Sequence, residues 1–122
     1  MVGEVEFRTF VGHDLIDASG KSIGYVVHLF DDEESGRPEW IGVLTGTLRH
    51  RHVMVPVSGA ESDGLSLKVP WSREKVKQAP TYGEDDWSGL LGIGEYKLTI
   101  SKEKEEQACA YYGRAEVAAP QR

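Results

Sequence analysis

The run DDEE, residues 31–34, is the longest uninterrupted acidic run in the chain. Carboxylates in a loop can bind calcium, and a calcium loop counted from Asp31 would have side-chain oxygens at its first, third and fifth positions and Gly36 at its sixth. Its twelfth position, however, is Gly42 where a bidentate glutamate is needed, and the strand-like EWIGV replaces the exiting helix. We therefore interpret the run as the solvated end of a strand, followed by a hairpin reversal over 35–38.

The RHRH segment is a second candidate site. On a strand, the spacing of His50 and His52 places both side chains on one face, where they could supply two imidazole ligands to a metal. A third ligand would have to come from elsewhere, such as His13 or His28, and no pattern marks either. The alternative is an exposed basic rim of four residues: Arg49, His50, Arg51 and His52. This patch is short and the formal net charge is -6, so we expect it to bind no nucleic acid.

Patterns for nucleophilic or cofactor chemistry are weak in this sequence. Cys109 lies between two alanines in a predicted helix, which favours a small, buried apolar role. No serine occupies a G-x-S-x-G elbow, and GLLGIGEY lacks the Lys-Ser/Thr pair of a phosphate-binding loop. The spacing of the acidic residues selects no acid–base pair. We therefore predict no catalytic residue, no cofactor-binding residue and no metal ligand, and expect that the protein is not an enzyme.

Aromatic side chains in the second half of the chain indicate a different kind of site. Tyr82 and Trp87 lie in an acidic, glycine-rich segment, and large amphipathic rings of this kind often anchor protein interfaces. Two further tyrosines end the predicted C-terminal helix. The candidate contacts with a partner are therefore Tyr82, Trp87, Tyr111 and Tyr112. The alternative is that the first two rings staple their segment to the body of the protein.

Length and composition favour one soluble globular domain. The chain has 122 residues, of which 39% are hydrophobic and 28% charged, and its 14 glycines indicate many turns. Its single cysteine excludes an intramolecular disulfide and fits a reducing compartment. No stretch approaches the roughly 18 to 20 apolar residues of a membrane span, and the N-terminus lacks a signal-peptide pattern. We expect a cytoplasmic protein.

The pattern of apolar and turn residues predicts a mainly β fold. Strands are expected on both sides of a turn at 17–20, and then in EWIGVLTG, HVMVPV, LSLKV and YKLTI. The segment TYGEDDWSGLLGIGEY is interpreted as an extended loop. Within the strand at 22–30, strict alternation places four side chains on one face: Ile23, Tyr25, Val27 and Leu29.

Two helices are predicted from their capping signals. Ser72 can cap a short helix near 73–79, which Pro80 would end. Ser101 can cap a second helix near 102–112, and Gly113 stands where a left-handed C-terminal residue belongs.

The order of these motifs resembles the PRC-barrel domain family. The resemblance rests on GHDLIDASGKSIGYVVHLFDDEESGRPEWIGVLTG, HVMVPVSGA, LSLKVPWSREKVKQAP and a helix ending in YYG. This family includes a domain of the photosynthetic reaction-centre H subunit, a domain of a ribosome maturation factor and many stand-alone bacterial proteins. The resemblance implies a small, strongly bent β-barrel over residues 12–113, preceded by a segment at 1–11. The tail at 114–122 is expected to be mobile because it lies at the end of the chain.

What the resemblance implies for individual residues is architectural. It assigns Asp17, Gly20, Ile23 and Gly24 to the first hairpin, Gly36, Pro38 and Trp40 to the next, and Pro56 and Pro70 to strand ends. The family has no shared catalytic residues, and its members dock onto other proteins or assemblies. We therefore expect a bacterial, non-enzymatic adaptor that binds either a protein partner of unknown identity or a second copy of itself, as a homodimer. The alternative function is a small ligand- or metal-responsive sensor.

Overall fold

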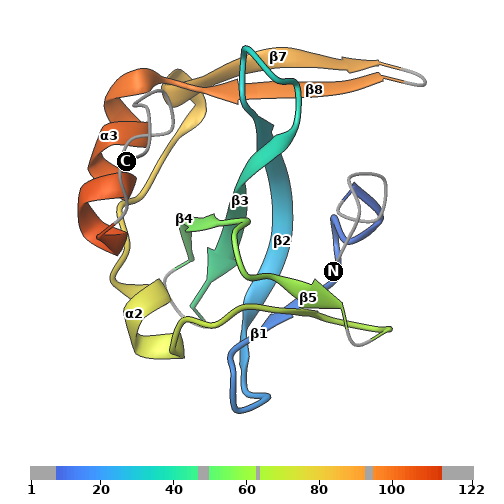
Figure 1. Cartoon of the computed structure of the whole chain (residues 1–122), viewed down its shortest axis with the longest axis vertical. Coiled ribbons are helices and arrows are strands. Elements are labelled where there is room, and N and C mark those ends of the chain that lie inside the picture. Colours follow the sequence, from blue (N-terminus) through green and yellow to red (C-terminus); the bar gives the residue numbers. More distant parts are fainter. Residues whose placement is uncertain (1–7, 47–49, 63, 93–94, 114–122) are drawn as a thin grey trace.

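Six strands form one sheet in the computed structural model, which describes residues 8–46, 50–62, 64–92 and 95–113. Their order in the sheet is β4-β3-β2-β1-β6-β5. Figure 1 shows β2 and β3 as long, curved strands through the middle of the molecule. The prediction of a mainly β fold is confirmed. The strand bounds are β1 (Asp14–Ile16), β2 (Ser22–Asp31), β3 (Pro38–Thr45), β4 (Arg51–Pro56), β5 (Glu61–Ser62) and β6 (Leu67–Lys68).

The sheet does not close into the predicted barrel. Within the described residues, β4 and β5 are the two ends of the strand order and do not pair with each other. The outer edge of β4 is covered instead by residues 80–82. The Met54 amide donates a hydrogen bond to the Pro80 carbonyl at 3.3 Å, and the Tyr82 amide donates to the His52 carbonyl at 3.0 Å. Because this segment takes up the His52 carbonyl and the Met54 amide, none of the described strands pairs with that edge and the sheet stays open.

Strand β2 is irregular, which changes the side chains that it presents to the core. Ser22 pairs with Ile16 and Gly24 with Leu15 of β1, so β2 carries an extra residue at Ile23. A bulge of this kind breaks strict alternation. Ile23 is therefore buried whereas Tyr25 is 58% exposed, and the predicted common face for these residues is wrong.

The first hairpin turn is organised by the buried Asp17 carboxylate. It accepts hydrogen bonds from the Ser19 hydroxyl at 2.7 Å and from the amides of Ser19 and Lys21, both at 2.9 Å. The hydroxyl contact, followed by the Lys21 amide, lowers the pKa of Asp17. Gly20 has a φ of 93°, in the left-handed region that favours glycine. The expected roles of Asp17 and Gly20 in this turn are confirmed.

The acidic, glycine-rich segment forms a hairpin. A short 3-10 turn, η1 (Glu84–Asp86), leads into β7 (Trp87–Gly92), which pairs antiparallel with β8 (Glu95–Ile100). The prediction of an extended loop is therefore wrong over β7. Gly89 marks a close backbone approach, because a Cβ there would meet the carbonyl oxygen of Lys97. Figure 1 shows the hairpin crossing the upper end of the molecule and projecting beyond it.

The two helices predicted from the sequence lie on one side of the molecule, at the left of Figure 1. They are α2 (Arg73–Lys77) and α3 (Lys102–Tyr112). Ser72 and Ser101 cap them by accepting a backbone amide hydrogen bond in the first turn, as predicted. Gly113 ends α3 with a φ of 72°. The bounds of α3 match the prediction, whereas α2 ends two residues before the predicted 79.

One hydrophobic core joins the sheet to the helices. Cys109 of α3 belongs to it at 2% exposure, as predicted, and Trp71 packs against it. The largest side chains under 2% exposure are Trp40, Phe30, Leu15, Leu29, Ile41, Met54, Leu67, Leu98, Val26, Val43, Val53 and Val55.

Candidate interaction surface

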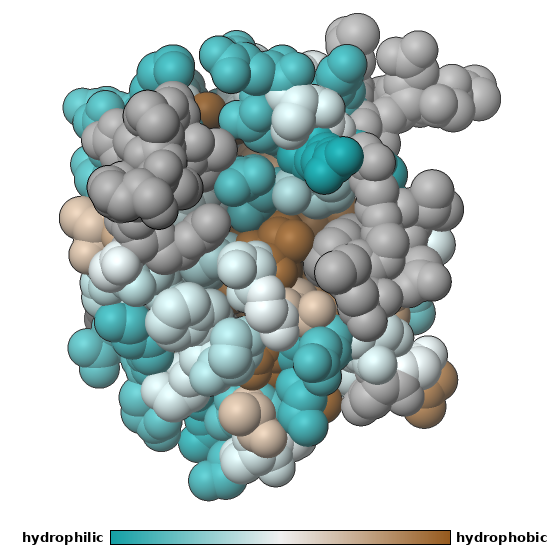
Figure 2. Space-filling model, viewed as in Figure 1, coloured by the Kyte–Doolittle hydropathy of each residue, from teal (hydrophilic) through white to brown (hydrophobic). Residues whose placement is uncertain are grey.

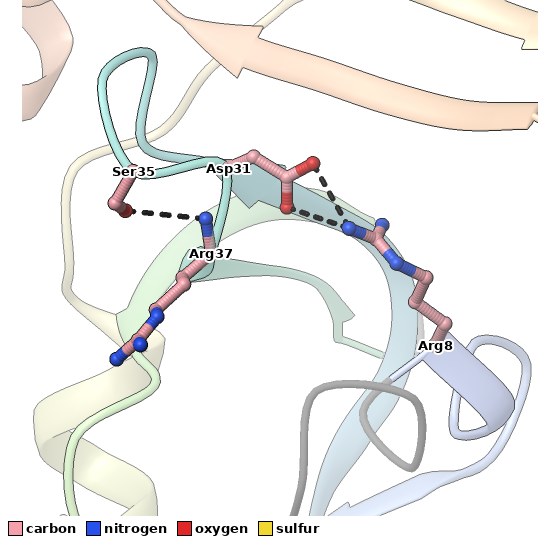
Figure 3. A network of polar contacts seen from close by, with 4 residues as sticks. All are labelled: Arg8, Asp31, Ser35 and Arg37. Carbon is pink, nitrogen blue, oxygen red and sulfur yellow. Dashed lines mark hydrogen bonds and ion pairs between the residues drawn. The ribbon is translucent and has the colours of Figure 1, made fainter.

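The acidic turn between β2 and β3 contains one buried ion pair. The Asp31 side chain is 2% exposed, and Nη2 of Arg8 donates to both of its carboxylate oxygens, at 3.0 and 3.1 Å. Figure 3 shows Arg8 reaching across from the N-terminal segment to this carboxylate. The interpretation of the whole acidic run as solvated is therefore wrong for Asp31, whose burial is compensated by the guanidinium group.

The rest of the turn has the predicted reversal. The Ser35 amide donates to the Asp32 carboxylate at 2.8 Å, and the Arg37 amide donates to the Ser35 hydroxyl at 3.2 Å (Figure 3). The side chains at 33–34 are exposed. Among the described residues, no group of three or more His, Cys, Asp or Glu side chains is placed to hold a metal ion. The metal-sensor alternative therefore gains no support from this turn.

Two histidines meet three aromatic rings beside the covered edge of β4. The hydroxyl of Tyr82 lies 2.8 Å from Nδ1 of His28, and the rings of His28 and Trp87 are 5.0 Å apart between centroids. The ring of His52 lies 6.4 Å from that of His28 and 5.6 Å from that of Tyr82. We call this group the histidine cluster; its members are His28, Phe30, His52, Tyr82 and Trp87.

The histidine cluster packs Tyr82 and His28 together beside the sheet, with the exposed His52 at its outer side. Burial lowers the pKa of His28, and the nearby His52 lowers it further, so the neutral imidazole is favoured. Tyr82 is only 6% exposed, so its hydroxyl is directed to His28 and not to a solute. Tyr82 therefore staples residues 80–82 to the sheet, which is the alternative that the sequence left open for this ring.

The residues of the predicted basic rim do not form one surface, because their side chains make contacts with different parts of the fold. His50, Arg51 and His52 are exposed, while Arg49 lies outside the described residues. Nη1 of Arg51 donates to the carbonyl oxygen of Lys77 at 2.8 Å, which ties β4 to the end of α2. His52 belongs to the histidine cluster, whereas His50 lines the groove described below.

The two C-terminal tyrosines fasten α3 to the rest of the fold. The buried Tyr112 donates its hydroxyl proton to the carbonyl oxygen of Met54 at 2.7 Å, and its burial raises its pKa. Tyr111 donates to the Lys75 carbonyl at 2.6 Å, and Nζ of Lys75 donates back to the Tyr111 carbonyl at 3.1 Å. Tyr111 and Trp87 are half-buried. Contact between a partner and the four predicted aromatic residues stays a prediction. Of the four, only Tyr111 and Trp87 expose part of their rings to solvent.

A groove of about 340 Å³ lies beside the exposed ring of Tyr25. Tyr25 pairs across the sheet with Leu44 of β3, and α2 supplies two cationic side chains to the lining. We call this the Tyr25 groove and use six of its lining residues: Ile23, Tyr25, Leu44, His50, Arg73 and Lys77. An aromatic and aliphatic floor beside cations suits the binding of a peptide segment.

Sequence reasoning missed the Tyr25 groove because strict alternation placed Tyr25 on the same face as Ile23 and Leu29. The extra residue at Ile23 turns Tyr25 outward, and no local pattern in IGYVV marks that bulge. The nearest signal was Gly24, which the resemblance assigned to the hairpin. A Cβ at Gly24 would meet the backbone of Leu44, so this glycine permits the close approach of β2 and β3 at the groove.

These features define a small, mainly β domain whose described surface carries a groove next to an exposed aromatic ring. The family model for the PRC-barrel domain matches residues 2–76, which is more than half of the chain. The chain therefore belongs to the PRC-barrel domain family, a family of general protein-interaction modules. A comparison with curated proteins finds no match. In the described part of the chain, no helix has both the length and the apolar character needed to span a membrane.

Proposed function

We propose that this chain is a non-enzymatic adaptor that binds a partner protein at the Tyr25 groove. The observation that carries the proposal is the 58% exposure of Tyr25 at a groove with an aliphatic neighbour, Leu44. When a partner covers an aromatic ring that is exposed to water in the unbound protein, the burial stabilises the complex, by about 2 kcal/mol if the ring becomes completely buried. Membership of a family of interaction modules supports the same function.

Further contacts are needed for a specific complex, because one ring covers a small part of an ordinary interface. The groove side chains around Tyr25 supply them first. Trp87 and Tyr111 are half-buried and can add secondary contacts, whereas Tyr82 and Tyr112 act inside the fold. We propose a cytoplasmic location for this adaptor, because a chain with a single cysteine forms no intramolecular disulfide and fits a reducing compartment.

Site-specific photo-crosslinking tests this function. A benzophenone amino acid replaces Tyr25 in one variant and Leu65, which is 83% exposed, in a matched control. We expect a discrete adduct from position 25 that untagged wild-type protein competes away, and none from position 65. Equal labelling at both positions, or no adduct at position 25, would contradict the proposal. The mass of the adduct shows whether the partner is a second copy of this 13.5 kDa chain.

A further inference from the structure

We propose that the Tyr25 groove receives an acidic segment of its partner, with a partner carboxylate at Arg73 and Lys77 and an apolar side chain on the ring of Tyr25. This inference rests on the proposed function and names the chemistry of the partner that the function leaves open.

The first support is the charge of the groove wall on α2. Arg73 and Lys77 are four residues apart in this short helix, so both point to the same side and both line the groove. Within the described residues, neither has a carboxylate of this chain at ion-pair distance. Lys77 is exposed, and His50 adds a third basic side chain to the lining. A partner carboxylate would therefore meet cationic groups that make no ion pair within the described part of this chain, although the Asp17 carboxylate lies near the Arg73 backbone.

The second support is the separation of charge over the molecule. The net charge is -6, yet none of the residues that line the groove is acidic. Acidic side chains gather instead around the β2–β3 turn, where Glu33 lines one pocket with Asp85 and Asp86. That turn lies at the upper end of Figure 1, whereas α2 lies at the lower end. A basic groove on an acidic protein selects acidic segments, because the rest of the surface repels them.

The third support is the apolar floor. Ile23 is buried, and Tyr25 and Leu44 present a ring and an aliphatic side chain next to each other across β2 and β3. Figure 2 shows a largely hydrophilic face, with hydrophobic residues visible in a central depression and at places toward its lower edge. Among the described residues, the exposed large hydrophobic side chains are Tyr25 and Leu65. Polyanions such as nucleic acids are attracted mainly through phosphate contacts with many cations. Three basic side chains around an aromatic floor match a short peptide better than a phosphate backbone.

Asp14 is an acidic residue of this chain close to the groove, and neutralising it tests the electrostatic part of the inference. It pairs directly with Tyr25 across β1 and β2, and its carboxylate accepts a hydrogen bond from the Ser22 hydroxyl at 2.8 Å. It does not line the groove, but it is the acidic neighbour that an incoming carboxylate would approach. Removing its charge should therefore strengthen the binding of an acidic segment.

Fluorescence anisotropy with a synthetic peptide tests the inference. The probe is labelled acetyl-EDLFEDE-amide, and the control probe is acetyl-KRLFKRK-amide. We expect the acidic probe to bind the wild-type protein and the basic probe not to bind it. Lys77→Gln should weaken the acidic probe about three- to tenfold, and Asp14→Asn should strengthen it about twofold. Lys102→Gln, which removes an exposed lysine next to the acidic turn, is the matched control and should change the affinity less than about twofold.

Three results would overturn the inference. The first is an equal loss of affinity in Lys77→Gln and Lys102→Gln, which would indicate attraction to charge in general. The second is binding of an oligothymidylate that is as tight as that of the peptide and insensitive to Tyr25→Ala. The third is unchanged affinity of the acidic probe for Tyr25→Ala, which would place the peptide away from the groove. Circular dichroism melting of each variant shows that it is folded.

Failure of this inference is separable from failure of the proposed function. A crosslinked partner at position 25, together with no binding of the acidic peptide, would refute the acidic segment and leave the adaptor function intact. The absence of any adduct at position 25 would refute both.

Discussion

The hydroxyl of Tyr82 and Nδ1 of His28 lie 2.8 Å apart, although 54 positions separate these residues in the chain. The contact joins the segment after α2 to the centre of β2. The ring of Tyr82 also meets Phe30 edge-on at 5.2 Å between centroids. One tyrosine therefore supplies both a polar and an aromatic link between the covered edge of β4 and the core.

Replacing Tyr82 by phenylalanine should remove the hydrogen bond to His28 and keep the ring. We expect the Tyr82→Phe variant to lose about 1 kcal/mol of unfolding free energy in urea denaturation, because the bond is largely shielded from water. Tyr25→Phe is the matched control, since the Tyr25 side chain is exposed, and should stay within about 0.5 kcal/mol of wild type. An equal change in the two variants would show that the hydroxyl of Tyr82 has no special role.

Acidification should destabilise the fold through His28. Burial, reinforced by His52, lowers the folded pKa of His28 below its unfolded value of about 6.5. The unfolded chain therefore takes up the proton first, so this stability is fully present above about pH 6.5 and is lost as the pH falls through the folded pKa. Urea unfolding from about pH 7.5 to 5 should show this loss.

The His28→Gln variant should show a smaller loss of stability over the same pH range, because it has no imidazole to protonate at this position. His13→Gln removes an exposed histidine and should keep the wild-type slope. If His28→Gln also keeps the wild-type slope, the protonation of His28 does not control this pH dependence.

A methyl group at Gly42 should disrupt the histidine cluster. A Cβ there would meet the Tyr82 hydroxyl and would lie 2.8 Å from Cζ of Tyr82 and 3.1 Å from Cβ of His28. We expect Gly42→Ala to lower the unfolding free energy by about 1 to 3 kcal/mol, the usual cost of overpacking. Gly83→Ala is the control, because a Cβ at Gly83 would meet nothing within 4 Å. Comparable stability of the two variants in thermal unfolding would argue against this steric limit.

The buried ion pair should also be measurable by mutation. Arg8→Ala leaves the Asp31 carboxylate buried without its guanidinium partner. We expect the unfolding free energy to fall by about 1 to 3 kcal/mol, which is less than for a fully buried ion pair because the Arg8 side chain is 28% exposed. Arg8→Ala made in an Asp31→Asn background should cost less, since the buried charge is already gone. Glu33→Gln, an exposed neutralisation in the same turn, should have little effect. Additive losses in the double variant would exclude coupling between Arg8 and Asp31.

Capping and turn residues predicted the elements that are stabilised by interactions between neighbours in the sequence. The bounds of α3 follow from a serine cap at Ser101 and a left-handed Gly113, and both act within one helical turn. The turn after β2 follows from the Ser-Gly-Arg-Pro reversal. The burial of Cys109 follows from its small apolar neighbours.

Long-range pairing explains what the sequence did not reveal. The glycines of β7 favour a loop locally, yet Gly89 is needed because the backbone of β8 lies against it. Closure of the barrel depends on which segment pairs with β4, and the segment that does so, residues 80–82, lies beyond β5, β6 and α2 in the chain. Tyr25 faces solvent because of an extra residue in β2, which has no compositional mark.

Residues 80–82 occupy the edge of β4 to which a strand from another molecule could otherwise add. A foreign strand that added to β4 would have to replace the hydrogen bonds of Met54 with Pro80 and of Tyr82 with His52. It would thereby pull Tyr82 away from His28 and open the core at the same point. Strand exchange at this edge is thus coupled to local unfolding, which disfavours edge-to-edge pairing at β4.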